Sequence, residues 1–242
     1  MLNELIAYFT FTPQEQSAIL LSIKVALVAM IFSLPFAIFV AWLLARKTFW
    51  GKALLNGIVH LPLVLPPVVI GYLLLIAMGR NGFIGKRLTE WFGFSFSFSW
   101  HGAALASAVV AFPLLVRAIR LALDNIDRKL EQAASTLGAS PCRVFFTITL
   151  PLALPGVLSG MILGFARSLG EFGATITFVS NIQDVTRTIP LAMYSFIETP
   201  NAESAAARLC VIAIIISLIS LIISEWLAKR MQQKLGQNNV ES

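Results

Sequence analysis

Residues 205–227 read AAARLCVIAIIISLISLIISEWL, and no charged residue occurs in this stretch between Arg208 and Glu225. A helix that crosses the hydrocarbon core of a bilayer needs about 20 predominantly apolar residues, and this segment meets that requirement. Hydrophobic residues make up 57% of the 242-residue chain and charged residues only 12%. A typical soluble domain has about 25% charged residues. This composition excludes a soluble enzyme, a disordered protein and a disulfide scaffold, and it predicts an integral membrane protein.

Four stretches upstream share this apolar character, and they cover residues 17–45, 53–79, 102–123 and 153–179. We therefore expect an all-α membrane protein with five transmembrane helices. The second stretch is interrupted by prolines, and the fourth contains Arg167 and Glu171. The transmembrane domain is expected over residues 17–228, between an external tail at 1–16 and a cytoplasmic tail at 229–242.

The lysines and arginines are distributed unevenly between the two sides of these five spans. One side holds Arg46, Lys47, Lys52, Arg117, Arg120, Arg128, Lys129, Arg143, Lys229, Arg230 and Lys234. The other side holds Arg80, Lys86, Arg87, Arg187 and Arg208. Because basic residues are enriched in cytoplasmic loops, this bias places the N-terminus outside and the C-terminus inside. The net charge of +6 is thus explained by topology and predicts no nucleic-acid partner.

The loop between the third and fourth spans, residues 124–151, is the longest segment on the basic side. Asp127 is a suitable N-cap for a helix over residues 128–137, and Gly138 is a suitable stop. Ser140 and Pro141 then predict the start of a second helix, which we expect to end at Pro151. Such a pair of short helices is either a structured connector or a rigid knob that docks on another protein.

The spacing within this loop resembles the EAA loop of ABC-importer permeases, without a gap or insertion. The matching positions are Glu131, Ala133, Ala134, Gly138, Ile148, Leu150 and Pro151. Gln132 stands where many members of the family have alanine. The resemblance implies that the first loop helix docks in a groove on a separate ATPase subunit.

Two further runs, LPLVLPP at residues 61–67 and ARSLGEFGA at residues 166–174, look like the oxyanion branch of these permeases. Over nearly its full length the chain looks most like the molybdate permease subunits of that branch. Some members carry an additional N-terminal span, whereas we expect five spans here. The cargo is expected to be molybdate, with tungstate, sulfate and thiosulfate as alternatives because these dianions are also tetrahedral.

This resemblance implies a type I ABC importer permease fold and a homodimer in the bacterial inner membrane. It also implies two ABC ATPase subunits on the cytoplasmic side and a periplasmic oxyanion-binding protein outside. MgATP is expected in the partner ATPase, and we expect no catalytic residue, metal or cofactor in this chain. Consistent with this expectation, the sequence contains no G-x-x-x-x-G-K-[ST] phosphate loop.

Prolines and charges inside the spans are candidates for the translocation pathway or its gate. Pro62, Pro66 and Pro67 remove backbone donors, so they predict either an opened pathway segment or a kink that shapes the dimer. Arg167 and Glu171 are four residues apart and share a helix face with Ser168 nearby. We favour mutual neutralisation of this pair, while attraction of an anion by Arg167 is the alternative.

A secondary transporter is the alternative from a different functional class. Such proteins usually show internal hydropathy repeats and intramembrane ion sites. Five spans do not divide into equal halves, and one Arg–Glu pair is a thin basis for ion coupling. The sequence therefore favours the ATP-driven importer.

Overall fold

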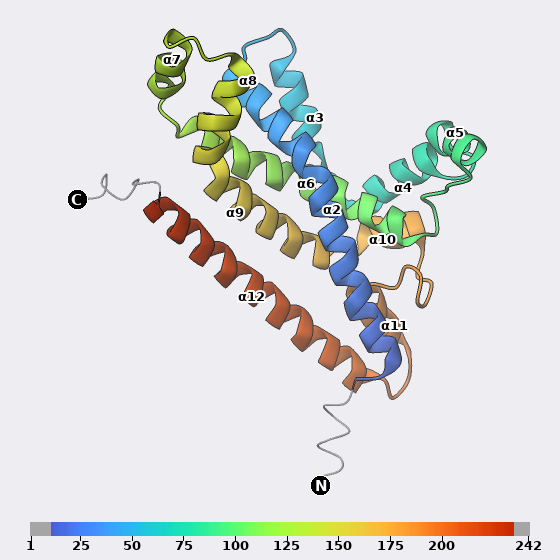
Figure 1. Ribbon diagram of the computed structural model, residues 1–242. Coiled ribbons are helices and arrows are strands. Elements are labelled where there is room, and N and C mark those ends of the chain that lie inside the picture. Colours follow the sequence, from blue (N-terminus) through green and yellow to red (C-terminus); the bar gives the residue numbers. More distant parts are fainter. Residues whose placement is uncertain (1–10, 235–242) are drawn as a thin grey trace.

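The computed structural model describes residues 11–234, and every regular element in that range is helical (Figure 1). The elements are α2 (Pro13–Arg46), α3 (Lys52–Val64), α4 (Pro67–Met78), α5 (Phe83–Phe92), α6 (Trp100–Asp124), α7 (Arg128–Thr136), α8 (Pro141–Val144), η1 (Phe145–Thr149), α9 (Leu150–Leu169), α10 (Gly173–Val179), α11 (Ile189–Glu198) and α12 (Glu203–Lys234). Figure 1 places α7 at one side of the molecule and α5 and α11 at the opposite side. The long helices α2, α9 and α12 connect the two sides.

The long helices pack in series, with α2 against α6, α6 against α9, and α9 against α12. Both α2 and α6 bury many small residues, including Ala26, Ala37 and Ala41 on α2 and Ala103 and Ala106 on α6. Small side chains let helix backbones approach closely, which is how helices associate where lipid removes the hydrophobic drive. The series of helices is therefore held by close van der Waals packing.

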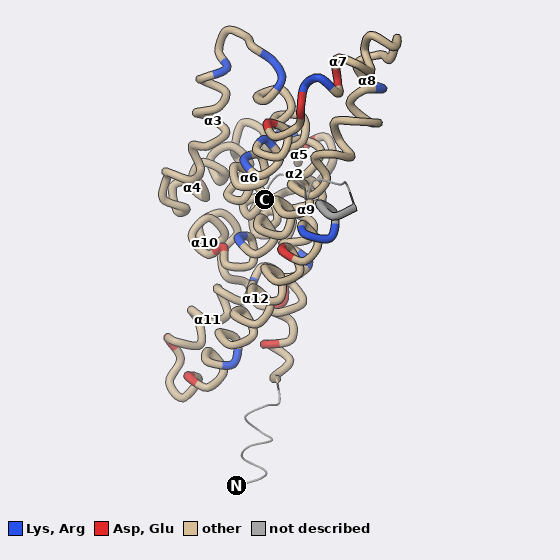
Figure 2. Tube along the Cα trace, turned by 90° about the vertical axis from the view of Figure 1, so that its left-hand side faces the viewer, with Lys and Arg blue, Asp and Glu red and all other residues tan. Residues whose placement is uncertain are grey.

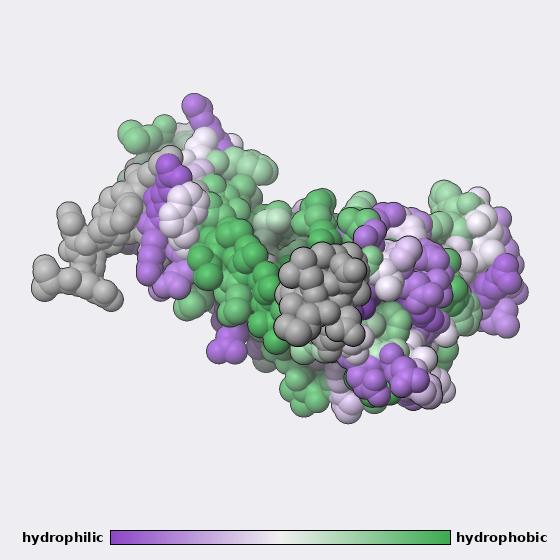
Figure 3. Space-filling model, turned by 90° about the horizontal axis from the view of Figure 1, so that it is seen from below, coloured by the Kyte–Doolittle hydropathy of each residue, from purple (hydrophilic) through white to green (hydrophobic). Residues whose placement is uncertain are grey.

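Large apolar side chains remain exposed on the outer faces of the long helices. Phe32 and Phe36 of α2 and Ile222 of α12 are each about two-thirds exposed. Figure 3 shows hydrophobic residues forming a band between hydrophilic patches. A surface of this kind belongs in a bilayer. Four helices in the described range are long and apolar enough to cross one, and a fifth crossing results if the bent α3–α4 pair counts as one span.

The second predicted span, residues 53–79, is not a straight helix. It breaks between Val64 and Pro67, and the axes of α3 and α4 differ by 115°. Pro66 and Pro67 start the new helix α4, as their fixed φ and missing N–H favour. Pro62, by contrast, lies inside the last turn of α3 without breaking it.

The fourth predicted span, residues 153–179, is divided in the same way. Helix α9 ends at Leu169, and the short helix α10 begins at Gly173. A glycine follows the end of α9, and the Glu171 carboxylate accepts a hydrogen bond from the Ala174 amide at 2.8 Å, which caps the new helix. The sequence marked the charged pair here but did not predict this break.

The second loop helix does not end at Pro151, contrary to the sequence expectation. It passes through one π-helical turn, Phe145–Thr149, and continues into α9. In this turn the Leu150 amide bonds to the Phe145 carbonyl, which shifts the hydrogen-bond register just before Pro151, a residue that cannot donate. Near the C-terminus, α12 continues to Lys234, so the predicted tail at 229–242 begins as helix, while residues 235–242 lie outside the described range.

Candidate functional site

Helix α7 has the limits that its capping residues predict. The Asp127 side chain accepts a hydrogen bond from the Lys129 amide at 2.9 Å, and Gly138 adopts φ +85° just after the helix. That left-handed conformation is accessible to glycine but strained for other residues. No side chain of α7 itself is buried, so the helix is a protruding element rather than part of the core.

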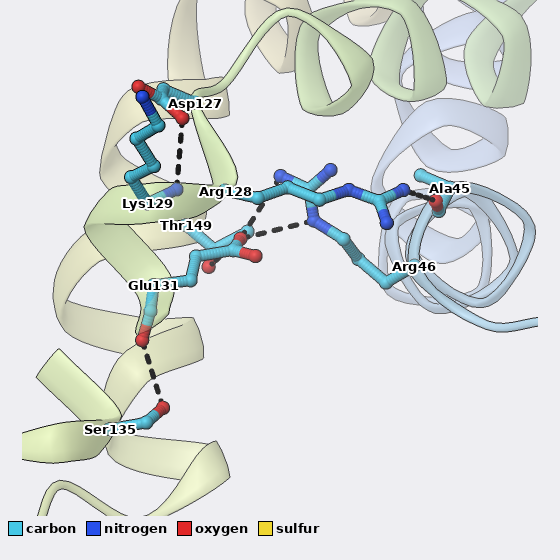
Figure 4. Close-up of polar contacts among 8 residues, drawn as sticks. All are labelled: Ala45, Arg46, Asp127, Arg128, Lys129, Glu131, Ser135 and Thr149. Carbon is cyan, nitrogen blue, oxygen red and sulfur yellow. Dashed lines mark hydrogen bonds and ion pairs between the residues drawn. The ribbon is translucent and has the colours of Figure 1, made fainter. Parts of the chain in front are cut away.

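Glu131 attaches α7 to two other parts of the chain (Figure 4). Its Oε1 accepts a hydrogen bond from Arg46 Nε at 3.1 Å and lies 3.0 Å from Arg46 Nη2, at the C-terminal end of α2. The same oxygen accepts a hydrogen bond from the Thr149 hydroxyl at 2.7 Å, at the start of α9. The side chains of Arg46 and Glu131 are only 8% and 19% exposed, so water screens this ion pair weakly.

A second arginine also connects α7 with α2, but here α7 supplies the arginine and α2 the acceptor. Arg128 of α7 donates a hydrogen bond from Nη2 to the Ala45 carbonyl at 3.2 Å. Ala45 lies in the last turn of α2, where carbonyl groups lack helical partners and the helix dipole favours cations. We call the set Ala45, Arg46, Arg128, Glu131 and Thr149 the α7 anchor. It joins α7 to both α2 and α9.

The opposite face of α7 is apolar and uncovered. Leu130, Ala133 and Leu137 follow one another at helical spacing of three and four residues. Leu130 is 50% exposed and Leu137 is 89% exposed. We call these three residues the α7 stripe. No role was predicted for its two leucines, although their periodicity with Ala133 is visible in the sequence.

The remaining EAA-loop positions have different surroundings. Ala134 is half-buried, and Gly138 is exposed where the chain leaves α7. Leu150 packs against the core cluster that includes Leu44 and Ala153, while Ile148 is half-buried and Pro151 exposed. Ile148, Leu150 and Pro151 therefore form the stem that joins the loop to α9.

The two broken spans lie side by side. Helix α4 packs against α10, and Figures 1 and 2 both place these helices together. A side chain added at Gly173 would meet Pro67 Cβ at 2.9 Å and the Val68 amide nitrogen at 3.2 Å. The structure thus brings Pro67 next to Gly173, two residues after the Arg167–Glu171 pair, although the two runs are about 100 residues apart in the sequence.

Arg167 and Glu171 form the ion pair that their spacing predicts. Arg167 Nη1 lies 2.9 Å from Glu171 Oε2, and the Glu171 side chain is 1% exposed. The other oxygen, Oε1, caps α10 at the Ala174 amide. The Arg167 side chain is 34% exposed, and the buried Ser168 hydroxyl has no hydrogen-bond partner in the described range. Glu171 Oε1 thus accepts a hydrogen bond, while Oε2 has only the ion pair with Arg167.

Comparison with known proteins identifies the family to which this chain belongs. A family model described as "Binding-protein-dependent transport system inner membrane component" matches residues 33–233. The chain belongs to this family. It is a multi-pass permease subunit of an ABC importer, located in the inner membrane, and its part in the importer is transport.

Two relatives are similar over nearly their whole length. The molybdenum transport system permease protein ModB of Haemophilus influenzae is 76% identical over 226 residues, which cover 93% of this chain and 99% of the relative. ModB of Escherichia coli strain K12 is 66% identical with the same coverage.

A solved structure confirms the fold at much lower sequence identity. The bacterial ABC transporter involved in the import of the acidic polysaccharide alginate matches with a TM-score of 0.72 at 16% identity, covering 94% of this chain and 83% of that chain. The all-helical, type I ABC importer permease fold expected from the sequence is thus confirmed.

Proposed function

We propose that this permease carries molybdate across the bacterial inner membrane as a homodimer, driven by two ABC ATPase subunits and supplied by a periplasmic oxyanion-binding protein. The observation that carries the proposal is the near full-length similarity to permeases named for molybdenum transport. The MgATP is bound and hydrolysed by the partner subunits, and this chain converts their movement into alternating access.

The α7 stripe is the surface we assign to the ATPase groove. It is apolar, helical and exposed on a protruding element, as a helix that inserts into a groove requires. The α7 anchor on the opposite face transmits the movement of the ATPase to α2 and α9. In this proposal Glu131 acts inside the permease as a positioning residue, whereas Leu130 and Leu137 contact the ATPase.

The orientation follows from the distribution of charge. Figure 2 shows Lys and Arg concentrated toward the end of the molecule that carries α7 and the start of α3. Assigning this end to the cytoplasm satisfies the preference of basic residues for that side and also exposes α7 to a cytoplasmic ATPase. The N-terminus is then periplasmic and the C-terminus cytoplasmic.

The paired helix breaks are our candidate for the pathway or gate. Interrupted helices occur at membrane depth where they are buried or line an aqueous cavity. Here Pro66 and Pro67 and the segment from Arg167 to Gly173 form one packed unit of two half-helices. A unit of this kind can shift as a body when α9, which carries Arg167, is displaced.

Uptake by the reconstituted transporter tests the function directly. Proteoliposomes that contain the permease, its ATPase and the binding protein should accumulate molybdate with ATP inside and no ion gradient. Uptake that requires an ion gradient instead of ATP would indicate a secondary transporter. A preference for sulfate, thiosulfate or tungstate over molybdate would assign another oxyanion as cargo.

Substitution of the intramembrane pair distinguishes its two interpretations. We expect Arg167→Ala to leave the Glu171 carboxylate buried without its counter-charge, which costs about 3–5 kcal/mol and impairs assembly. The double variant Arg167→Ala/Glu171→Gln removes both charges and retains an oxygen to cap α10, so it should assemble better than the single variant. Assembly is measured by size-exclusion chromatography of the purified complex, and transport by uptake.

An outcome in which Arg167→Ala assembles normally but does not transport would contradict the structural role. It would instead support contact of Arg167 with the anion. The exposed i,i+4 pair Lys86–Glu90 on α5 is a suitable control, because its double alanine variant removes equal charge from a solvated surface.

A further inference from the structure

A polar cavity separate from the helix breaks lies between α3 and α6. It has a volume of about 380 Å³ and is lined by Asn56 and His60 of α3 and by Arg117, Arg120, Leu121 and Asp124 of α6. A water molecule in the liquid occupies about 30 Å³, so the cavity has room for a hydrated anion. We call it the α3–α6 cavity. From the sequence alone, its arginines were predicted only to mark the cytoplasmic side.

The polar groups on one side of the cavity are held in a fixed arrangement. Arg120 Nη1 donates a hydrogen bond to Asn56 Oδ1 at 2.9 Å, and Arg120 Nε lies 3.6 Å from Asp124 Oδ2. His60 Nδ1 donates to the Asn56 carbonyl at 2.8 Å, because a carbonyl oxygen only accepts. The Asn56 side-chain oxygen thus faces Arg120, and the two N–H groups of its amide donate to no other residue in the part of the chain that the structure describes.

Arg117 makes no comparable contact with the described residues. Its side chain is exposed, and it forms no ion pair or hydrogen bond within residues 11–230. It lies seven residues before the end of α6, which corresponds to about 10 Å along the helix axis. An unpaired guanidinium at that depth is costly in lipid and is normally found facing a bundle interior or a water-filled space. The face of α6 that carries Arg117 therefore belongs to such a space.

The charge of the cavity favours an anion. The single carboxylate, Asp124, is engaged by Arg120, so the guanidinium of Arg117 leaves the cavity with a net positive charge. Guanidinium groups bind tetrahedral oxyanions through paired N–H donors, and the free amide of Asn56 adds two more donors. None of the lining polar side chains is fully buried, which keeps any bound anion hydrated and its affinity low.

We propose that the α3–α6 cavity is a weak exit site for a free tetrahedral oxyanion on the cytoplasmic half of the permease, with Arg117 as its principal contact. The assignment of this anion as the transported cargo rests on the proposed function above. A site that binds weakly serves transport, because an ion must be attracted enough to enter and still be released. The phosphate group of an anionic lipid has the same chemistry, and the experiment below separates the two sources.

The test measures the local affinity for anions with a thiol at the edge of the cavity. In a Cys142→Ser/Cys210→Ala background, Leu121→Cys adds a thiol at a position that lines the cavity and is 63% exposed. The assembled transporter is placed in phosphatidylcholine nanodiscs. The rates of modification by a sulfonate-bearing thiosulfonate reagent and by a neutral reagent of similar size are then compared.

We expect Arg117→Gln to lower the ratio of the anionic to the neutral rate by roughly threefold to tenfold, because the attracting charge is removed. Arg117→Lys should retain most of the ratio. Arg230→Gln removes the same charge from the exposed end of α12 and should leave the ratio unchanged. Added molybdate should slow the anionic reagent in the Leu121→Cys protein and have a much weaker effect in the Arg117→Gln variant.

Each other outcome overturns a defined part of the proposal. An unchanged ratio in Arg117→Gln shows that the cavity does not attract anions. Protection by added phosphatidylglycerol but not by molybdate assigns the cavity to a lipid phosphate. If molybdate uptake by proteoliposomes is normal while protection is absent, only the exit site fails. If uptake selects another oxyanion and that oxyanion protects, the exit site stands and the cargo assignment fails.

Discussion

Replacing Glu131 with alanine should reduce ATP-driven uptake by the assembled transporter about tenfold or more while leaving the ATPase bound. The variant removes the acceptor shared by Arg46 and Thr149 and leaves a guanidinium that is 8% exposed without its counter-charge. Loss of such an interaction costs roughly 1–3 kcal/mol, and 1.4 kcal/mol corresponds to a tenfold change in an equilibrium. The α7 stripe is unchanged in this variant, so docking persists while transmission to α2 and α9 is lost.

The measurement is uptake and ATP hydrolysis in the same vesicles. We expect ATP hydrolysis to continue while the number of anions transported per ATP falls. Glu131→Gln keeps the side-chain shape and one oxygen acceptor, so it should have an intermediate effect. Gln132→Ala is the matched control, because this neighbouring side chain is exposed and lies outside the anchor. Full coupling in Glu131→Ala would contradict the role of the anchor.

A double-mutant cycle separates the ion pair from more general effects. Arg46→Ala and Glu131→Ala should each impair coupling, and together they should impair it by less than the sum of the two single effects. Additive losses would show that the two residues act independently, and the ion pair between them would then make no contribution to coupling.

The spans and the caps of α7 could be predicted from local sequence, because their causes are local. A charge-free run fixes the existence of a span, and the Asp127 and Gly138 positions fix where α7 begins and ends. The breaks were harder to predict. Proline marked the break before α4, but no proline marks the break at Gly170, and the bond from the Ala174 amide to Glu171 could not be distinguished in advance from an ordinary intrahelical pair.

The candidate site was recognised only where it has a local pattern. The spacing of the EAA loop identified Glu131, but its partner Arg46 is 85 residues away and looked like a topological marker. The α3–α6 cavity likewise joins Asn56 to Arg120 across 64 residues. The 115° turn between α3 and α4 depends on what each helix packs against, which is tertiary information that a proline alone does not carry.

The close approach of α4 and α10 predicts that a larger residue at Gly71 will impair both stability and transport. A Cβ added at Gly71 would lie 2.5 Å from the Ala174 carbonyl oxygen and 2.8 Å from Thr177 Cβ. A backbone oxygen cannot rotate away, so Gly71→Ala forces α4 and α10 apart. Overpacking of this kind costs about 1–3 kcal/mol. We expect a lower melting temperature of the purified complex and loss of most ATP-driven uptake, because the two half-helices no longer form one unit.

Gly57→Ala is the matched control for this prediction, since the same methyl group there meets nothing within 4 Å. Alanine is favoured over glycine inside a helix by about 0.5–1 kcal/mol, so the control should be as stable as the parent or slightly more stable. Gly71→Ser is expected to resemble Gly71→Ala, because the steric conflict arises at Cβ and not from polarity. If Gly71→Ala has the melting temperature and the uptake rate of the parent, the contact between α4 and α10 is not a rigid unit that moves during transport. The assignment of the two helix breaks to the pathway or gate would then be wrong.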